Sequence, residues 1–83
     1  MQVAVRLSGE LAAQAGRPRF NVTLAEGATV GELKEQLYQE YPQILSLLDT
    51  AVPIIAGKHV TRSEPLTNGL EVAFLLPIAG GLF

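Results

Sequence analysis

"TVGELKEQLYQEYP", residues 29–42, is the stretch that decides the fold, because it predicts one long amphipathic helix. Thr29 and Glu32 have the T-x-x-E spacing of a capping box, in which two side chains satisfy backbone amides at the start of a helix. Pro42 cannot continue a helix, so the predicted helix covers residues 30–41. One face of this helix is apolar and should pack on a core: Val30, Leu33, Leu37 and Tyr41.

The residues before this helix predict two strands. Larger apolar residues alternate with polar or small ones at residues 1–6 and again at 20–24, which is the period of a half-buried strand. The intervening residues 10–19 contain Gly16 and Pro18, so we expect a loop or wide turn there. The two strands would then form a hairpin with a long connection.

The residues after the helix predict shorter elements. Residues 43–51 are compatible with a second short helical turn, but nine residues leave the periodicity undecided. Short strands are expected at 52–57 and within 58–64, and a fifth at 70–76 follows the turn signal Asn68-Gly69. This order of elements predicts an α+β fold in which the main helix packs across one face of a single sheet.

Composition limits the classes of function. The 83 residues suit one small domain, and 48% of them are hydrophobic, so the chain can bury a core. There is no cysteine, and the single histidine, His59, has no metal-ligating neighbours, so we expect no metal site. A net charge of −2 without a basic stripe argues against nucleic acid, and no apolar run is long enough to span a membrane. We expect a cytoplasmic protein.

Four segments occur in the order found in ubiquitin-like β-grasp proteins: MQVAVRLSGE (1–10), VTLAEGATVGELKEQL (22–37), IIAGKHV (54–60) and LEVAFLLPIAGG (70–81). The last segment resembles the C-terminus of the MoaD/ThiS-like sulfur-carrier family, which includes the small subunit of molybdopterin synthase and the thiamine sulfur carrier. The resemblance implies a mixed sheet of four to five strands. It also implies a β-grasp domain at residues 1–77 followed by a flexible tail at 78–83.

The resemblance implies a chemical role for two adjacent glycines. In this family the carboxylate of the second glycine, here Gly81, is adenylated by an ATP-dependent activating enzyme and converted to a thiocarboxylate that donates sulfide. The chain would be a protein cosubstrate and not an enzyme. It would bind no cofactor itself, since ATP and a sulfur donor would be used through the activating partner. Gly80 and Gly81 carry no side chain, so their backbone can enter a narrow channel.

Leu82 and Phe83 depart from the family pattern, because Gly81 then has an amide in place of the required carboxylate. The departure resembles a subset of carriers made as precursors, in which a JAMM-type zinc metalloprotease cleaves after the diglycine. We therefore expect cleavage between Gly81 and Leu82. The acceptor would be a sulfur-accepting synthase or a sulfhydrylase, in the biosynthesis of a molybdopterin-type cofactor or of metabolites and amino acids. Alternatively, Leu82 and Phe83 fold back onto the sheet and the glycines form an ordinary turn.

The last strand indicates where a partner docks. Alternation assigns Val72 and Phe74 to the core and leaves Leu75 on the outer face, although Leu75 could also be buried. Resemblance to the binding patch of ubiquitin adds Ile54 to the docking surface. The alternative function is a ubiquitin-like interaction module or protein modifier. The full expected partner-binding set is Ile54, Leu75, Pro77, Ile78, Leu82 and Phe83.

Overall fold

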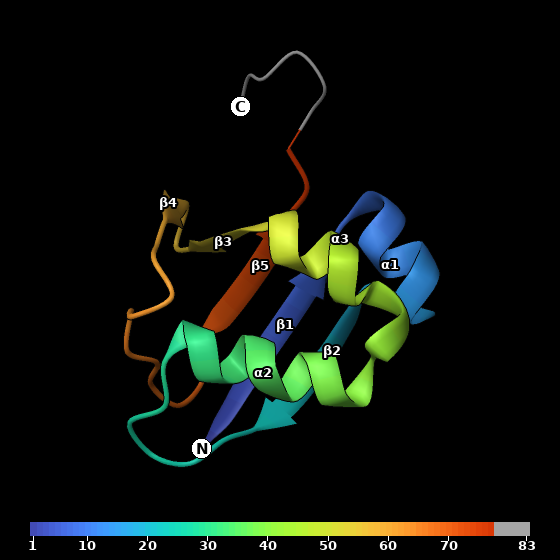
Figure 1. Cartoon of the computed structure of the whole chain (residues 1–83). Helices are drawn as coiled ribbons and strands as arrows, with labels where there is room; N and C mark the ends of the chain where they lie inside the picture. Colours follow the sequence, from blue (N-terminus) through green and yellow to red (C-terminus); the bar gives the residue numbers. More distant parts are fainter. Residues whose placement is uncertain (78–83) are drawn as a thin grey trace.

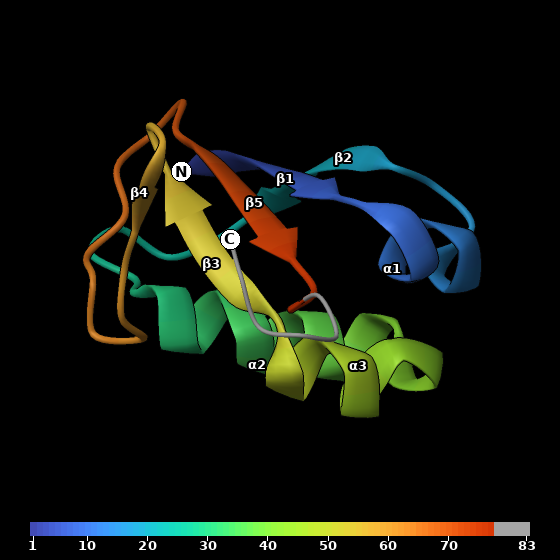
Figure 2. The same cartoon turned by 90° about the horizontal axis from the view of Figure 1, so that it is seen from above.

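A computed structural model describes residues 1–77 of the chain, and in it a five-stranded mixed sheet carries helices on one face (Figures 1 and 2). The strand order is β2-β1-β5-β3-β4, with β1 parallel to β5 and the other neighbours antiparallel. The predicted α+β fold is confirmed. The elements are β1 (Gln2–Leu7), α1 (Gly9–Ala15), β2 (Arg19–Thr23), α2 (Val30–Glu40), the 3₁₀ helix η1 (Pro42–Ile44), α3 (Leu45–Thr50), β3 (Val52–Ile55), β4 (Lys58–His59) and β5 (Glu71–Leu75).

The main helix α2 begins as the sequence predicted. The Glu32 backbone amide donates to Thr29 Oγ1 at 3.3 Å, and the Thr29 amide donates to Glu32 Oε1 at 3.0 Å, so both halves of the capping box are present. The helix ends at Glu40, one residue earlier than expected, and Tyr41 caps it. The cap therefore fixes where α2 starts, and Pro42 begins the next element.

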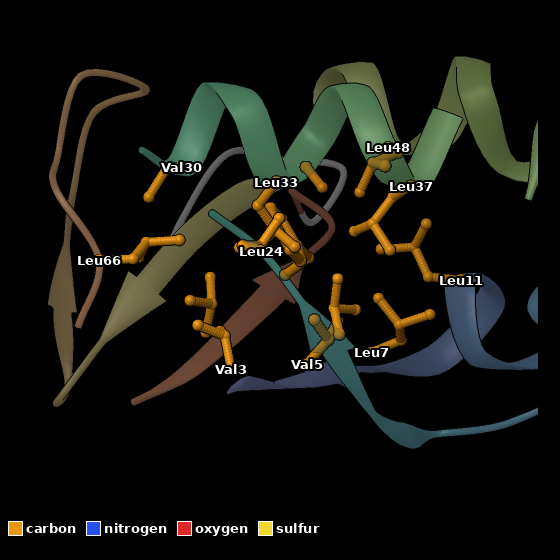
Figure 3. Packing of buried hydrophobic residues seen from close by; sticks show 14 of the residues in the cluster. Val3, Val5, Leu7, Leu11, Leu24, Val30, Leu33, Leu37, Leu48 and Leu66 are labelled. Carbon is orange, nitrogen blue, oxygen red and sulfur yellow. The ribbon is translucent and has the colours of Figure 1, made fainter. Parts of the chain in front are cut away.

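The core lies between α2 and the sheet (Figure 3). Val3 and Val5 of β1 meet Leu33 and Leu37 of α2 there, and all four side chains are fully buried. Leu33 and Leu37 thus face inward, as predicted. The opposite face of the sheet is covered by no helix within residues 1–77 (Figure 2). Among residues 1–77 no helix is both long enough and apolar enough to cross a membrane.

The prediction of a loop at residues 10–19 was wrong, because helix α1 occupies Gly9–Ala15. Leu11 is its one fully buried residue, and the other apolar residues that pack on the core are the small Ala12 and Ala15, so the apolar repeat of the segment is weak. Gly16 has φ 86° and its amide donates to the Ala12 carbonyl, which makes it the C-terminal cap of α1 and not a loop glycine. The antiparallel pairing of β1 with β2 is nevertheless as expected.

The segment that the sequence left undecided, residues 43–51, is helical. It contains the end of η1 and the whole of α3, with Ile44 and Leu48 fully buried. Strands β3, β4 and β5 lie within the predicted ranges. The sheet accordingly has five strands, the upper end of the expected range.

The start of α2 is also held by the loop between β4 and β5. The Gly31 amide donates to the Arg62 carbonyl at 2.8 Å, and the Val30 amide donates to the Glu64 carbonyl at 3.0 Å. A Cβ atom at residue 31 would lie 3.2 Å from the Arg62 carbonyl oxygen. Gly31 therefore allows the loop backbone to approach the helix closely.

We expect Gly31→Val to lower the free energy of unfolding by about 1–3 kcal/mol, because the added side chain pushes the Arg62 backbone away. Urea unfolding followed by circular dichroism measures the change. Glu35→Val is the matched control, because Glu35 is exposed on the same helix. Equal midpoints for the two variants would show that the close approach at Gly31 has no energetic consequence.

Candidate functional site

The last strand before the predicted tail, β5, is the central strand of the sheet. Strand β5 lies between β1 and β3 and is hydrogen-bonded on both sides (Figure 1). The Ser8 hydroxyl adds a bond to the Phe74 carbonyl at 3.5 Å near the end of that strand. Leu76 is half-buried and Pro77 is exposed. A central strand is a firm anchor for whatever follows Pro77.

The predicted reactive and cleavage residues lie outside the described residues. These are Gly80, Gly81 and Leu82, and the same holds for Ile78 and Phe83 among the expected partner-binding residues. Their roles, the boundary between domain and tail, and the alternative in which Leu82 and Phe83 fold back stay predictions.

The two faces of β5 differ as the alternation predicted. Val72 and Phe74 are fully buried against the core, whereas Leu75 is half-buried on the outer face. Ala73 also faces outward but is covered, with 2% of its surface exposed. A small side chain between larger neighbours is shielded even on the open face of a sheet.

Ile54 and Leu75 lie on one apolar surface, together with two residues that the sequence reasoning missed. Val52, Ile54, His59 and Leu75 line a hollow of about 230 Å³, which we call the apolar seat. Val52 lies opposite Leu75 in the β3–β5 pair, and Ile54 lies opposite His59 in the β3–β4 pair. Val52 shares a face with Ile54 because it precedes Ile54 by two residues, so strand alternation alone could have identified it.

His59 is exposed on strand β4 and lines one side of the seat. Within residues 1–77 no three side chains of the metal-ligating types gather into a possible metal site. The pKa of Tyr38 is raised by burial and by the nearby Asp49 carboxylate, whose Oδ1 lies 3.3 Å from the hydroxyl. Tyr38 and Asp49 join α2 to α3 and lie away from the seat.

A comparison with protein families identifies the chain. A family model described as the ThiS family matches residues 5–81, which is most of the sequence. The chain belongs to the ThiS family. The ThiS-family match runs through Gly80 and ends at Gly81, and Leu82 and Phe83 lie beyond it.

Individual relatives agree with this assignment. The molybdopterin synthase sulfur carrier subunit of Mycobacterium tuberculosis is 34% identical over 64 residues, covering 77% of each chain. The crystal structure of SAMP1, the small archaeal modifier protein 1 of Haloferax volcanii, superposes with a TM-score of 0.87 at 25% identity and covers 98% of this chain and all of that one.

A third structure was solved as a complex. It contains subunits 1 and 2 of the molybdopterin-converting factor of Helicobacter pylori, and it matches with a TM-score of 0.72 at 23% identity, covering 98% of this chain and 100% of that one. At this identity the likeness concerns the fold. The ubiquitin-like β-grasp fold of the ThiS-family chain is thereby confirmed.

Proposed function

We propose that this chain is a sulfur carrier whose reactive group is a thiocarboxylate at Gly81. The observation that carries the proposal is the family match, whose range, residues 5–81, includes Gly80 and ends at Gly81. The relative from M. tuberculosis, named as the sulfur carrier subunit of molybdopterin synthase, supports it. The chain then acts as a cosubstrate in the cytoplasm, where ATP is supplied, and not as an enzyme.

The chemistry needs an external activator. An α-carboxylate has a pKa of about 3.5, so at neutral pH it is an anion that resists nucleophiles. An activating enzyme would join it to the α-phosphate of ATP, releasing pyrophosphate and leaving an acyl-adenylate. A donor that supplies sulfide would then attack the Gly81 carbonyl carbon, so that a carbon–sulfur bond forms and AMP leaves. The carrier itself supplies only a correctly placed backbone.

Processing has to come first. Leu82 follows Gly81, so the Gly81 carbonyl lies in a peptide bond, and hydrolysis of that bond by water frees the carboxylate. A JAMM-type zinc metalloprotease is the proposed catalyst. Leu82 and Phe83 protect Gly81 from premature activation and give the protease two apolar side chains to bind.

The apolar seat is the proposed docking surface for the activating enzyme and later for the sulfur acceptor. Ile54 and Leu75 are accessible on it, close to the end of the strand that leads to the tail. Pro77 and Ile78 would line the entrance to the partner's channel. The acceptor is a synthase subunit in molybdopterin-type biosynthesis, or a sulfhydrylase in metabolite thiolation. The solved complex of the H. pylori subunits supports the first class.

We expect Leu75→Asp to weaken binding to the activating enzyme by about 1–3 kcal/mol, because it places a charge in the seat. Isothermal titration calorimetry with the purified enzyme measures the change. Gln39→Asp, on an exposed position of α2, adds the same charge on the helix side and should bind normally. A large drop in thermal stability of Leu75→Asp would show instead that Leu75 belongs to the core.

The second candidate is a protein modifier or interaction module, and the similarity to SAMP1 favours it. The intact mass of the protein from its native cell separates the two candidates. A sulfur carrier loses Leu82 and Phe83 and gains about 16 Da when oxygen is replaced by sulfur. A modifier appears linked through Gly81 to the amines of other proteins.

A further inference from the structure

The outer face of the sheet continues beyond the apolar seat into a charged region. On that face Arg6 Nε lies 3.3 Å from Glu71 Oε1, and Arg19 Nη2 lies 2.8 Å from Glu71 Oε2. Arg6 is on β1, Arg19 on β2 and Glu71 on β5. One carboxylate therefore holds two guanidinium groups side by side.

The seat and the charged region are parts of one cross-strand row. Ile54 lies opposite Ala73, Ala73 opposite Arg6, and Arg6 opposite Arg19. Neighbouring strands are about 4.8 Å apart, and Ile54 and Arg6 are two strands apart, so the backbone positions of these two residues are separated by about 10 Å. Ala73 lies between them, and its small side chain leaves the surface low at that point.

The surface along this row is hollowed. A hollow of about 280 Å³ shares Ile54 with the apolar seat, and it reaches Arg6 and Glu71. A further hollow of about 420 Å³ shares Glu71 with it and reaches Arg19. The three hollows follow one another along the row, apolar at the β3–β4 end and charged at the β1–β2 end, and we call them together the outer groove.

The charged end of the outer groove carries surplus positive charge, although the chain has a net charge of −2. The side chains of Arg6 and Arg19 remain 47% and 67% exposed despite their ion pairs with Glu71. Each guanidinium has five N–H donors in a planar fork, and each uses one of them on Glu71. The remaining N–H groups can donate to a second carboxylate, and the bridging Glu71 keeps the two guanidinium groups in place for it.

We propose that the outer groove is one continuous docking surface, and that its occupant is a segment of the activating enzyme with an apolar side chain about 10 Å from a carboxylate. The apolar side chain enters the seat, and the carboxylate binds Arg6 and Arg19. We choose this partner because its carboxylate would complement the positive charge of Arg6 and Arg19. The groove also shares Ile54 with the seat, which is the proposed docking surface for the same enzyme. The inference rests on the proposed sulfur-carrier function, because it assigns the groove to that function's first partner.

The double variant Arg6→Gln, Arg19→Gln tests the inference. Binding of the full chain to the purified activating enzyme from the same organism is measured by calorimetry without ATP, at low and at high salt. We expect the double variant to raise the Kd about tenfold at low salt, because a charged contact and its electrostatic steering are lost. The difference from the unmodified chain should shrink in high salt, since the lost contact is solvent-exposed.

A control of equal net charge is Arg17→Gln, Arg62→Gln. Arg17 lies over the Phe20 ring and donates to the Tyr41 hydroxyl, and Arg62 lies against Gly31 of α2. Neither arginine lines any of the three hollows of the outer groove. This control should bind nearly as the unmodified chain does.

The outcomes separate this inference from the proposed function. Equal affinity of the unmodified chain and the Arg6, Arg19 double variant overturns the inference, as does equal weakening by the control pair or failure of the unmodified chain to bind. Pyrophosphate exchange by the protein that ends at Gly81 reports on the sulfur-carrier function independently. If that exchange occurs while the arginine variants bind normally, the carrier function stands and the charged half of the groove has no docking role.

Discussion

The full chain is expected to be inert with an activating enzyme and ATP, whereas the protein ending at Gly81 is expected to exchange pyrophosphate and to accept sulfide. The physical reason is that adenylation needs a free carboxylate, and in the full chain the Gly81 carbonyl is part of the bond to Leu82. We expect no pyrophosphate exchange with the full chain and normal exchange with the protein that ends at Gly81. ATP–pyrophosphate exchange followed by intact mass spectrometry measures it.

A third protein, Gly81→Val in the shortened chain, tests whether a free carboxylate is sufficient for activation or whether the residue that carries it must also lack a side chain. It keeps the free carboxylate but adds a β-branched side chain where bare backbone must enter a narrow channel, so we expect no exchange. Its affinity for the activating enzyme should fall little, because the apolar seat is unchanged. Equal activity of the full and shortened chains, with no processing detected, would contradict the precursor hypothesis and favour the binding-module alternative.

Phe74→Ala is expected to destabilise the domain by about 3–5 kcal/mol, because it truncates the largest fully buried side chain of the core and leaves a cavity there. A domain of this size has a total stability of about 4–12 kcal/mol, so the loss can unfold much of the protein at 37 °C. Thermal and urea unfolding followed by circular dichroism measure the change.

Leu75→Ala is the matched control, because Leu75 is the next residue of the same strand on the opposite face. It should cost about 1 kcal/mol or less, since the side chain is half-exposed and leaves no closed cavity. It should nevertheless weaken docking, whereas Phe74→Ala protein that remains folded should dock normally. Equal midpoints of unfolding for the two variants would contradict the assignment of β5 faces.

The elements that could be predicted from the sequence are those with a local cause. The capping box is formed by Thr29 and Glu32, which are only three residues apart, and the apolar stripe of α2 lies within this one helix. Both signals are therefore visible in a short stretch of sequence, and α2 was predicted to within one residue of its end. Strand alternation likewise separated Phe74 from Leu75. Such signals are visible because the interacting groups are close in the sequence.

Helix α1 could not be predicted, because its stability comes from outside the segment. Seven residues are too few to form a helix in isolation, and the main apolar contact of this one is Leu11, packed into the core. Helix α3 is one residue shorter, with Leu48 fully buried, and its periodicity was undecided for the same reason. Both helices form because the core accepts them.

The sequence by itself determined the alternating strands, the capped helix α2 and the diglycine with two further residues, each of which depends on neighbours along the chain. Only the tertiary structure added further residues to the proposed docking face. It brought Val52 and His59 beside Leu75, and it placed Arg6 against Glu71, 65 residues later. The reason is the strand order: β5, the last strand, pairs between β1 and β3, and strand pairing over such distances is set by the packing of the whole core.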